Sequence, residues 1–208
     1  RVLFRSDTVA FAEEHQVGIV SDFAYGAIGF DGNQPLSFLQ TAGAKSVGIE
    51  TYTFSKTFNM AGWRVGFAVG NADMIAALNL IQDHLFVSIF PAIQDAAIAA
   101  LAQRKQRTDA VGQLQAVYES RRNAFINAVR SFNWEPYVPK GAFYVLMPVP
   151  KGYTSAQFAE LLLNRANVAV ADASGFGDAG EGYVRVGLTI TEDRLVEAAN
   201  RIKALNLF

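Results

Sequence analysis

Polar residues stand next to three apolar runs of the kind that form buried strands. Asp22 ends the first run, Lys56 follows the second, and Arg64 directly precedes the third. In an open parallel sheet, ligands bind beyond the carboxyl ends of the strands, so side chains in these places can reach a ligand. We therefore treat Asp22, Lys56 and Arg64, together with the nearby Tyr25, as candidate site residues.

Each of these candidates has a chemical role and a plainer alternative. A lysine among phenylalanines, as at Lys56, loses proton affinity through desolvation and can then act as an amine nucleophile that forms a Schiff base. Arg64 lies between Trp63 and an apolar strand, so it needs an anionic partner, either a protein carboxylate or a phosphate. The alternatives are that Asp22 caps the turn after its strand and that Lys56 is a surface-turn lysine.

A further candidate, Arg185, lies in the alternating segment 183–188. The two-residue period of a strand puts Arg185 on the face opposite Val184 and Val186. An arginine on the inner face of a strand can hold a carboxylate through two parallel hydrogen bonds. The alternative is an arginine on an edge strand that forms a surface ion pair.

Other motifs are interpreted as structural. The segment 175–180 matches Gly-x-Gly-x-x-Gly, but the pattern after it predicts a strand, and a pyrophosphate needs the N-terminus of a helix. Arg121 and Arg122, with Glu119 nearby, are predicted to lie on a solvated helix face. His84 ends an apolar helix and is interpreted as a structural residue.

The composition excludes several classes of protein. Of 208 residues, 51% are hydrophobic and 18% are charged, which argues against a disordered chain. Lys and Arg total 18 against 19 Asp and Glu, so no excess of positive charge points to a nucleic-acid partner. Without cysteine and with two histidines, neither a disulfide nor a metal site is expected. The longest apolar run, 85–93, is too short to span a bilayer, so no membrane partner is expected.

Apolar runs and helical periodicity alternate along the chain, which predicts an α/β fold with a mostly parallel sheet flanked by helices. The first part predicts strands at 17–20, 46–54 and 65–69 and helices at 7–16, 74–81 and 111–129. The last third predicts a small α+β domain with strands at 142–147, 168–171 and 183–188 and helices at 158–162 and 195–205. Thr154 and Gln157 have the spacing of a capping box before the first of these two helices. We place the domain boundary at residue 124, which gives domains 7–123 and 124–208.

Residues 53–66, Thr-Phe-Ser-Lys-Thr-Phe-Asn-Met-Ala-Gly-Trp-Arg-Val-Gly, resemble the lysine loop of class I/II pyridoxal-phosphate-dependent aminotransferases. That motif has a hydroxyl three residues before the lysine and an arginine eight residues after it, as Thr53 and Arg64 stand here around Lys56. Asp22 and Tyr25 match the upstream pair of the same family. The resemblance covers 7–208 and implies the C-terminal part of a fold-type-I enzyme.

The resemblance also implies a role for each matching residue. Lys56 would hold pyridoxal 5′-phosphate covalently and then move a proton during the reaction. Asp22 would pair with the pyridine nitrogen and keep it protonated, so that the ring can accept electrons. Tyr25 would hydrogen-bond the phenolic oxygen of the ring.

The remaining implied roles concern two anionic groups. Thr53, Ser55 and Arg64 would bind the cofactor phosphate, although Thr53 stands where the family more commonly has serine. Arg185 would bind the α-carboxylate of the substrate.

The activity implied by the family is transfer of an amino group between an L-amino acid and a 2-oxo acid. The runs 22–32 and 180–188 resemble the bacterial methionine-salvage branch of the family, which aminates 4-methylthio-2-oxobutanoate. A C–S β-lyase of the same fold shares the lysine, aspartate and tyrosine and is one alternative. A non-catalytic fragment is another. By family resemblance, the full-length enzyme is expected to be a cytoplasmic homodimer.

The start of the chain carries its own expectation. Family members place a glycine- and serine-rich phosphate loop, a ring-stacking aromatic residue and an asparagine partner of the cofactor upstream of the position of Asp7. We therefore expect an N-terminally truncated enzyme that, as 208 residues, binds the cofactor weakly and turns over little. Residues 1–6 are expected to be a non-native leader, since they match the translation of a sequencing adapter. The alternative is a genuine segment of a longer chain.

Overall fold

The computed structural model describes residues 2–105 and 110–208. They form two compact units, the first comprising residues up to Gly29 and Gln34–Leu114, and the second Phe30–Asn33 and Gln115–Phe208. The division therefore falls inside helix α6 (Ala110–Arg130), between Leu114 and Gln115, whereas the sequence placed it at residue 124. Because the helix is continuous across the division, its periodicity carries no signal of the change.

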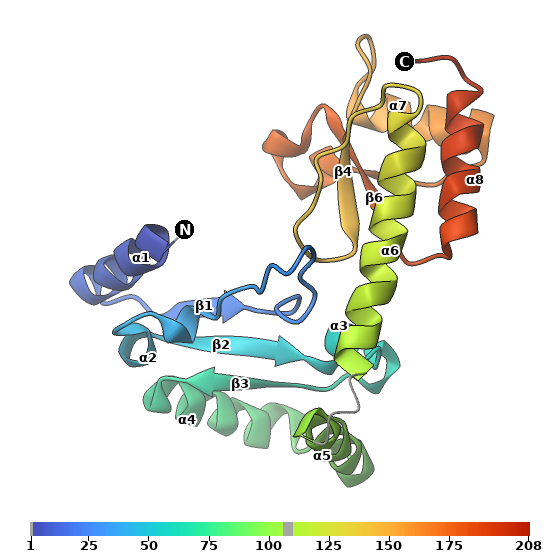
Figure 1. The fold of residues 1–208 in the computed structure, drawn as a ribbon. Coiled ribbons are helices and arrows are strands. Elements are labelled where there is room, and N and C mark those ends of the chain that lie inside the picture. Colours follow the sequence, from blue (N-terminus) through green and yellow to red (C-terminus); the bar gives the residue numbers. More distant parts are fainter. Residues whose placement is uncertain (1, 106–109) are drawn as a thin grey trace. The chain divides into compact units, whose positions relative to one another are not determined.

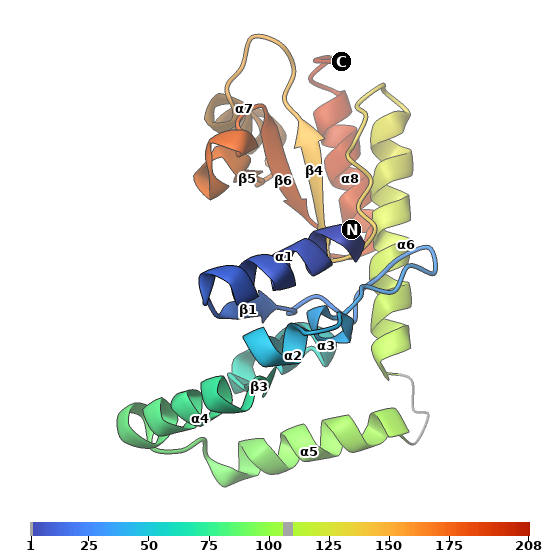
Figure 2. The ribbon, with the colours of Figure 1, turned by 90° about the vertical axis from the view of Figure 1, so that its left-hand side faces the viewer.

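The first unit consists of a small sheet and the helices beside it (Figure 1). On the β1 side of the sheet lies α1, and α4 and α5 lie on the β3 side, as both ribbon views show (Figures 1 and 2). The short 3₁₀ turns η1 and η2 and the π-helical turn η3 connect these elements. In chain order they are α1 (Val2–His15), β1 (Ile19–Asp22), η1 (Phe38–Gln40), α2 (Ala44–Val47), β2 (Gly48–Thr53), α3 (Phe54–Thr57), η2 (Ala61–Trp63), β3 (Gly66–Gly70), α4 (Ala72–Ile81), η3 (Gln82–Phe86) and α5 (Pro91–Lys105).

The sheet of the first unit has the strand order β1-β2-β3. β1 and β2 pair in parallel, with Asp22 opposite Thr51. β3 runs antiparallel to β2, with Gly66 opposite Thr53. This antiparallel strand departs from the mostly parallel sheet that the sequence predicted. Its consequence is that the carboxyl ends of β1 and β2 and the amino end of β3 lie at one edge of the sheet.

Close backbone approach requires glycine at the start of β3. A Cβ atom on Gly66 would lie 2.5 Å from the carbonyl oxygen of Tyr52, which is far inside van der Waals contact. Only a residue without a side chain can occupy this place in the ladder. This close approach fixes the position of the first residue of β3 against β2, and it therefore also limits where the residues just before β3 can lie.

One prediction for the first unit was wrong, and one of its helices was missed. Helix α5 was not predicted, because its alanine-rich sequence carries no regular stripe of large apolar residues. Strand β1 is not fully buried, since Val20 is 63% exposed. The helix predicted at 7–16 is present as α1, which begins at Val2.

Glu50 is a fully buried carboxylate in β2 that joins three elements of the first unit. Its Oε2 accepts hydrogen bonds from the backbone N–H of Phe38 at 2.7 Å and from Ser21 Oγ at 3.1 Å. Its Oε1 accepts from the hydroxyl of Tyr52. This residue therefore ties β1 and η1 to the central strand.

Substitution of Glu50 tests this arrangement. Glu50→Leu is expected to lower the free energy of unfolding by about 2 kcal/mol, because it leaves a buried backbone N–H unpaired. Glu50→Gln should cost less, since its amide oxygen can still accept from Phe38. Urea unfolding followed by circular dichroism measures both, with the exposed Glu14→Gln as control. A leucine variant as stable as the parent would contradict this role.

The second unit also has one sheet, with the strand order β4-β6-β5, and all of its pairs are antiparallel. Helices α6 and α8 lie side by side, and Ser120 Oγ of α6 donates to Glu192 Oε1 of α8 at 2.6 Å (Figures 1 and 2). The other elements follow α6 in the order β4 (Tyr144–Pro148), α7 (Ser155–Leu161), η4 (Leu162–Ala166), β5 (Ala171–Asp172), η5 (Ala173–Phe176), η6 (Asp178–Gly180), β6 (Tyr183–Gly187) and α8 (Glu192–Lys203).

Helix α7 begins at the predicted capping box. Thr154 Oγ1 accepts from the backbone N–H of Gln157 at 3.2 Å, and Gln157 Oε1 accepts from the backbone N–H of Thr154 at 3.0 Å. The strand predicted at 168–171 was largely wrong, because only Ala171 and Asp172 pair with β6.

An aromatic cluster fills one end of the second unit. Trp134 is 1% exposed and stacks on Phe208, with 4.9 Å between ring centroids. Its indole N–H donates to the carbonyl oxygen of Pro148 at 2.8 Å, and Phe158 meets its ring edge to face. Phe208, which is 40% exposed, therefore covers this cluster from the surface.

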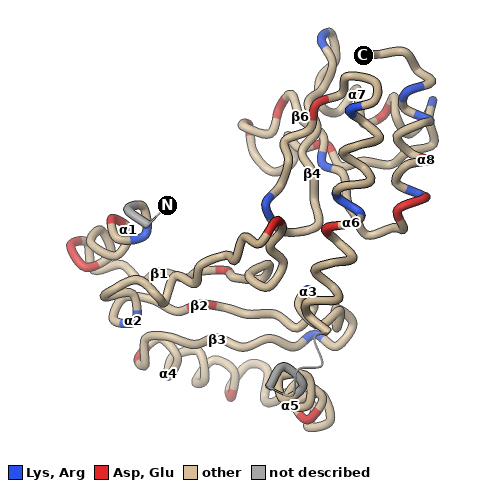
Figure 3. Tube along the Cα trace, in the orientation of Figure 1, with Lys and Arg blue, Asp and Glu red and all other residues tan. Residues whose placement is uncertain are grey.

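Charged residues of both signs are spread along the chain (Figure 3). Within residues 2–105 and 110–208, none of the helices has both the length and the apolar character required to cross a membrane.

Candidate active site

The sequence-predicted residues of the first unit follow or precede the strand ends at one edge of its sheet. Asp22 is the last residue of β1 and Thr53 the last of β2. Lys56 lies in α3, directly after β2, and Arg64 lies two residues before β3. Because β3 is antiparallel to β2, its preceding residues reach the same edge as the residues that follow β2. The structure thus brings the ends of these three strands together, as the candidate site requires.

Asp22 is positioned by the turn that follows β1. The backbone N–H of Phe23 donates to the carbonyl oxygen of Thr51 at 3.0 Å, which extends the pairing with β2 by one residue. Asp22 Oδ1 accepts from the backbone N–H of Ala24 at 3.2 Å. The turn-capping alternative is therefore observed, and the exposed carboxylate remains able to accept a further hydrogen bond.

Lys56 and Tyr25 meet at this edge. Lys56 is half-buried, and its Nζ lies 6.0 Å from the centroid of the Tyr25 ring. Thr53 caps α3, since its Oγ1 accepts from the backbone N–H of Ser55 at 3.1 Å. Ser55 is 8% exposed. An amine and two hydroxyl groups thus stand within four consecutive residues whose backbone is fixed by β2 and by the helix cap.

Arg64 has an unusual backbone conformation. Its φ of 51° and ψ of 47° lie in the left-handed region, which costs a non-glycine residue on the order of 1 kcal/mol. Its Nη1 donates to the carbonyl oxygen of Ala61 at 3.0 Å, and among the described residues it forms no ion pair with a carboxylate. Of the two anionic partners expected for Arg64, the described part of the chain does not supply the carboxylate.

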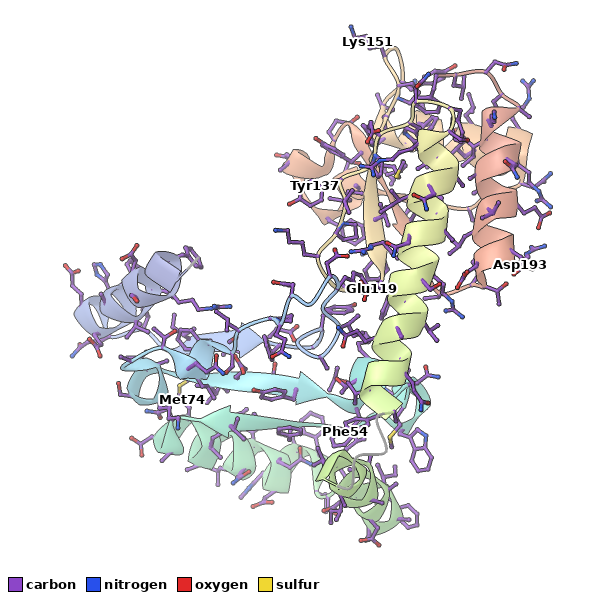
Figure 4. The ribbon with its side chains drawn as sticks, viewed as in Figure 1. Phe54, Met74, Glu119, Tyr137, Lys151 and Asp193 are labelled. Carbon is purple, nitrogen blue, oxygen red and sulfur yellow. The ribbon has the colours of Figure 1, made fainter. Side chains whose placement is uncertain are left out.

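A hydrophobic cluster supports the loop that carries Lys56 and Arg64. Phe54, 2% exposed, and Val65, 8% exposed, flank this loop and pack with Ala97 and Ala100 of α5. Phe54 lies between the carboxyl end of β2 and α5 (Figure 4). Its backbone N–H also donates to the carbonyl oxygen of Val65 at 3.2 Å. Helix α5, which the sequence did not predict, therefore anchors both ends of the loop.

Arg185 belongs to the second unit, where the predicted alternation of β6 is confirmed. Val184 is fully buried and Val186 is 8% exposed, while Arg185 lies on the other face. Its Cζ lies 4.2 Å from the centroid of the Tyr144 ring and 4.1 Å from that of Phe176. With the residues that the structure describes, it forms no ion pair, so the surface-pair alternative is not observed.

The prediction of a solvated face was wrong for Arg122. This residue is 2% exposed, and its two terminal nitrogens each lie 2.7 Å from an oxygen of Asp31. It also donates to the carbonyl oxygen of Pro139 at 3.1 Å and lies over the ring of Phe30, 4.8 Å from its centroid. Hydrogen bonds from Arg122 hold the pKa of the Asp31 carboxyl below its usual range. The sequence carried no signal of this pair because Asp31 is 91 positions away.

The structural interpretation of the glycine motif is confirmed. Residues 175–180 lie in the short turns η5 and η6, and β6 follows them rather than a helix.

His84 Nδ1 lies 2.9 Å from the carbonyl oxygen of Leu80, as a local contact within its own turn. In the described ranges, no three His, Cys, Asp or Glu side chains gather in a way that could hold a metal ion.

The donor set of the first unit has the chemistry that pyridoxal phosphate needs. A phosphate dianion binds to hydroxyl groups and a guanidinium, which Thr53, Ser55 and Arg64 could supply. An aldehyde carbon is attacked by an amine, which Lys56 could supply. A protonated pyridine nitrogen pairs with a carboxylate such as that of Asp22.

Residues 6–202 match the family described as Aminotransferase class I and II. The chain is 61% identical over 205 residues to the L-glutamine–4-(methylsulfanyl)-2-oxobutanoate aminotransferase of Bacillus subtilis, covering 99% of this chain and 51% of that protein. It is 42% identical to the LL-diaminopimelate aminotransferase of Moorella thermoacetica, covering 96% and 50%.

Solved structures show the same similarity. The apo structure of BacF from Bacillus subtilis superposes with a TM-score of 0.93 at 42% identity, covering 100% of this chain and 52% of that one. An aminotransferase from Staphylococcus aureus gives a TM-score of 0.92 at 39% identity, covering 100% and 55%. The chain thus spans about half the length of the curated relatives it matches.

Enzymes of this family depend on pyridoxal phosphate. The matched residues include the sheet edge with Lys56 as well as β6 with Arg185. The fold is that of the C-terminal part of a fold-type-I enzyme. The chain belongs to the class I and II aminotransferases.

Proposed function

We propose that the protein carrying this chain is a pyridoxal-phosphate-dependent aminotransferase that moves an amino group between an L-amino acid and a 2-oxo acid. The observation that carries this proposal is the gathering of Asp22, Lys56 and Arg64 at the strand ends of one sheet, with the Tyr25 ring centroid 6.0 Å from Lys56 Nζ. The family membership and the match to named aminotransferases support it.

The residues of the chain divide the work as follows. Thr53, Ser55 and Arg64 bind the cofactor phosphate, and the carboxylate of Asp22 stabilises positive charge on the pyridine nitrogen. When bound, pyridoxal phosphate supplies an electron sink that stabilises negative charge at the substrate Cα. Lys56 Nζ removes the proton from that carbon as a general base. Tyr25, whose ring centroid lies 6.0 Å from Lys56 Nζ, would hydrogen-bond the phenolic oxygen of the cofactor ring.

The substrate pair that we propose is L-glutamine and 4-methylthio-2-oxobutanoate. Support comes from the name of the Bacillus subtilis relative, which is 61% identical to this chain. The LL-diaminopimelate aminotransferases at 42% identity suggest the competing substrate.

The test is an assay of the purified full-length protein that carries this chain, with pyridoxal phosphate, L-glutamine and 4-methylthio-2-oxobutanoate, and with methionine measured by chromatography. Parallel reactions contain LL-diaminopimelate with 2-oxoglutarate, or cystathionine without an amino acceptor. Methionine formed faster than the other products supports the proposal. Pyruvate and ammonia from cystathionine, without methionine from the first reaction, would instead identify a C–S β-lyase.

We also propose that the enzyme is a cytoplasmic homodimer, as the family resemblance implies. Several large apolar side chains of the first unit are exposed near η3 and α5, among them Leu85, Phe86 and Phe90 at 71%, 68% and 69%. Exposed apolar clusters of this kind are typical of protein interfaces. Analytical ultracentrifugation of the full-length protein should give the mass of a dimer. Cell fractionation should recover the protein in the cytoplasmic fraction.

A further inference from the structure

We propose that Phe176 and Tyr144 are positioning residues that orient the Arg185 guanidinium to bind the substrate carboxylate. This inference rests on the proposed function, because it concerns the anionic group that the substrate presents to Arg185. It adds two side chains that the motif of the family did not point to.

The geometry places both aromatic rings against the guanidinium. The Arg185 Cζ atom lies 4.1 Å from the Phe176 centroid and 4.2 Å from the Tyr144 centroid. Such distances are well within the range of a cation–π contact. The rings come from different segments, since Tyr144 begins β4 and Phe176 ends η5. Two separate parts of the second unit therefore converge on one arginine.

The contacts leave the hydrogen-bonding capacity of Arg185 available. Aromatic rings contact a guanidinium through its carbon and its planar face, whereas its N–H donors lie at the edge of the plane. Across 2–105 and 110–208, no hydrogen bond or ion pair of the Arg185 side chain is formed with another residue. The rings thus contact the guanidinium carbon while its donors remain available to a carboxylate.

Phe176 is held in place by the loop that carries it, although 63% of its surface is exposed. Asp172 caps this loop, because its Oδ1 accepts from the backbone N–H of Ser174 at 2.9 Å. At Gly180 a Cβ atom would lie 1.9 Å from the carbonyl oxygen of Ala173, so only glycine permits this close turn. The Asp172 cap and the close approach at Gly180 therefore shape the turn that presents Phe176 to Arg185.

Because Phe176 is largely exposed, its substitution is not expected to destabilise the fold. Phe176→Leu keeps an apolar side chain of similar reach but removes the aromatic face, while Phe176→Tyr retains that face. Tyr137→Leu is the matched control, because Tyr137 is a 68% exposed aromatic residue of the same unit (Figure 4). The thermal midpoints of all three variants are expected to stay close to that of the parent protein.

Two unreactive ligands separate positioning from general binding. The first, 2-hydroxy-4-(methylthio)butanoate, carries a carboxylate, and the second, 3-(methylthio)propan-1-ol, does not. Phe176→Leu is expected to weaken binding of the hydroxy acid on the order of fivefold by calorimetry, while binding of the alcohol is unchanged. In the amino-transfer assay the same variant should raise KM for the 2-oxo acid by a similar factor and leave kcat within about twofold. Phe176→Tyr should restore the parent values.

Each outcome decides the inference. Equal weakening of both ligands, or a leucine variant that matches the parent, would overturn the positioning role. A parent protein that binds the hydroxy acid no better than the alcohol would overturn it as well. Failure of the proposed function is distinguishable, because it removes methionine formation while the binding comparison still reports on Arg185.

Discussion

Replacing Lys56 by alanine should lower the rate of amino transfer by the full-length protein by about 10³-fold, because under the proposed function it removes both the amine nucleophile and the general base. Lys56 is the amine at the sheet edge where Asp22 and Arg64 also stand, and its Nζ faces the ring of Tyr25. Lys56→Arg should be nearly as inactive, since a guanidinium does not lose its proton in proteins and cannot act as a base.

The measurement for Lys56 is single-turnover transamination by the full-length protein at saturating cofactor. Lys45→Ala is the matched control, because Lys45 is an exposed lysine of the same unit outside the sheet edge, and it should retain parent activity. Borohydride reduction followed by peptide mass spectrometry should place the cofactor on Lys56. An alanine variant with more than about a tenth of the parent rate would contradict the assignment.

The second large effect is expected on stability, from Arg122→Ala. Arg122 is 2% exposed and binds both oxygens of Asp31 as well as the carbonyl oxygen of Pro139. Alanine would remove these bonds and leave a cavity next to the Phe30 ring. We expect the free energy of unfolding of the second unit to fall by about 2 kcal/mol, because packing against Phe30 is lost and the Pro139 carbonyl oxygen loses its donor.

Tryptophan fluorescence can report on the second unit alone. Trp134 is buried there and Trp63 lies in the first unit, so a Trp63→Phe background leaves a single reporter. Arg130→Ala is the control, because Arg130 lies on the same helix but pairs with Glu135 at the surface, where an ion pair contributes at most about 1 kcal/mol. Equal losses for the two variants would show that the Asp31 pair adds nothing.

The same pair predicts a dependence on pH. Arg122 lowers the pKa of Asp31 in the folded state from its ordinary 3.8. A carboxyl of this kind stabilises the fold at pH values above its unfolded pKa, and the stabilisation is lost as the pH falls through the lower folded pKa. The stability difference between the parent and Arg122→Ala should therefore be constant at neutral pH and shrink below about pH 4. A difference that grows on acidification would contradict this linkage.

Features set by neighbouring residues could be predicted from the sequence. The capping box of Thr154 and Gln157 depends on residues three apart, and the burial of Val184 and Val186 depends on alternation within one strand. The spacing between Lys56 and Arg64 likewise pointed to a family that the comparison confirmed. The individual roles of these site residues stay predictions that the experiments above address.

Features set by distant residues could not be predicted. The direction of β3 follows from how the chain returns after η2, and no local pattern distinguishes a parallel from an antiparallel neighbour. The partner of Arg122 comes from a turn near the start of the chain. The rings of Tyr144 and Phe176 converge on Arg185 only after β4, β6 and the η5 turn have packed together.

The short segment Phe30–Asn33 has a practical consequence for anyone who wishes to isolate the second unit. A recombinant fragment that begins at Gln115 would lack Phe30, which is fully buried, and Asp31, the counter-ion of Arg122. Such a fragment would expose the apolar side chains that Phe30 covers, and it would leave the buried Arg122 without its carboxylate partner. Joining residues Phe30–Asn33 to such a fragment, or adding them as a synthetic peptide, should restore the apolar contacts of Phe30 and the Asp31–Arg122 pair. The second unit is thus compact in space but is built from two separate segments of the sequence.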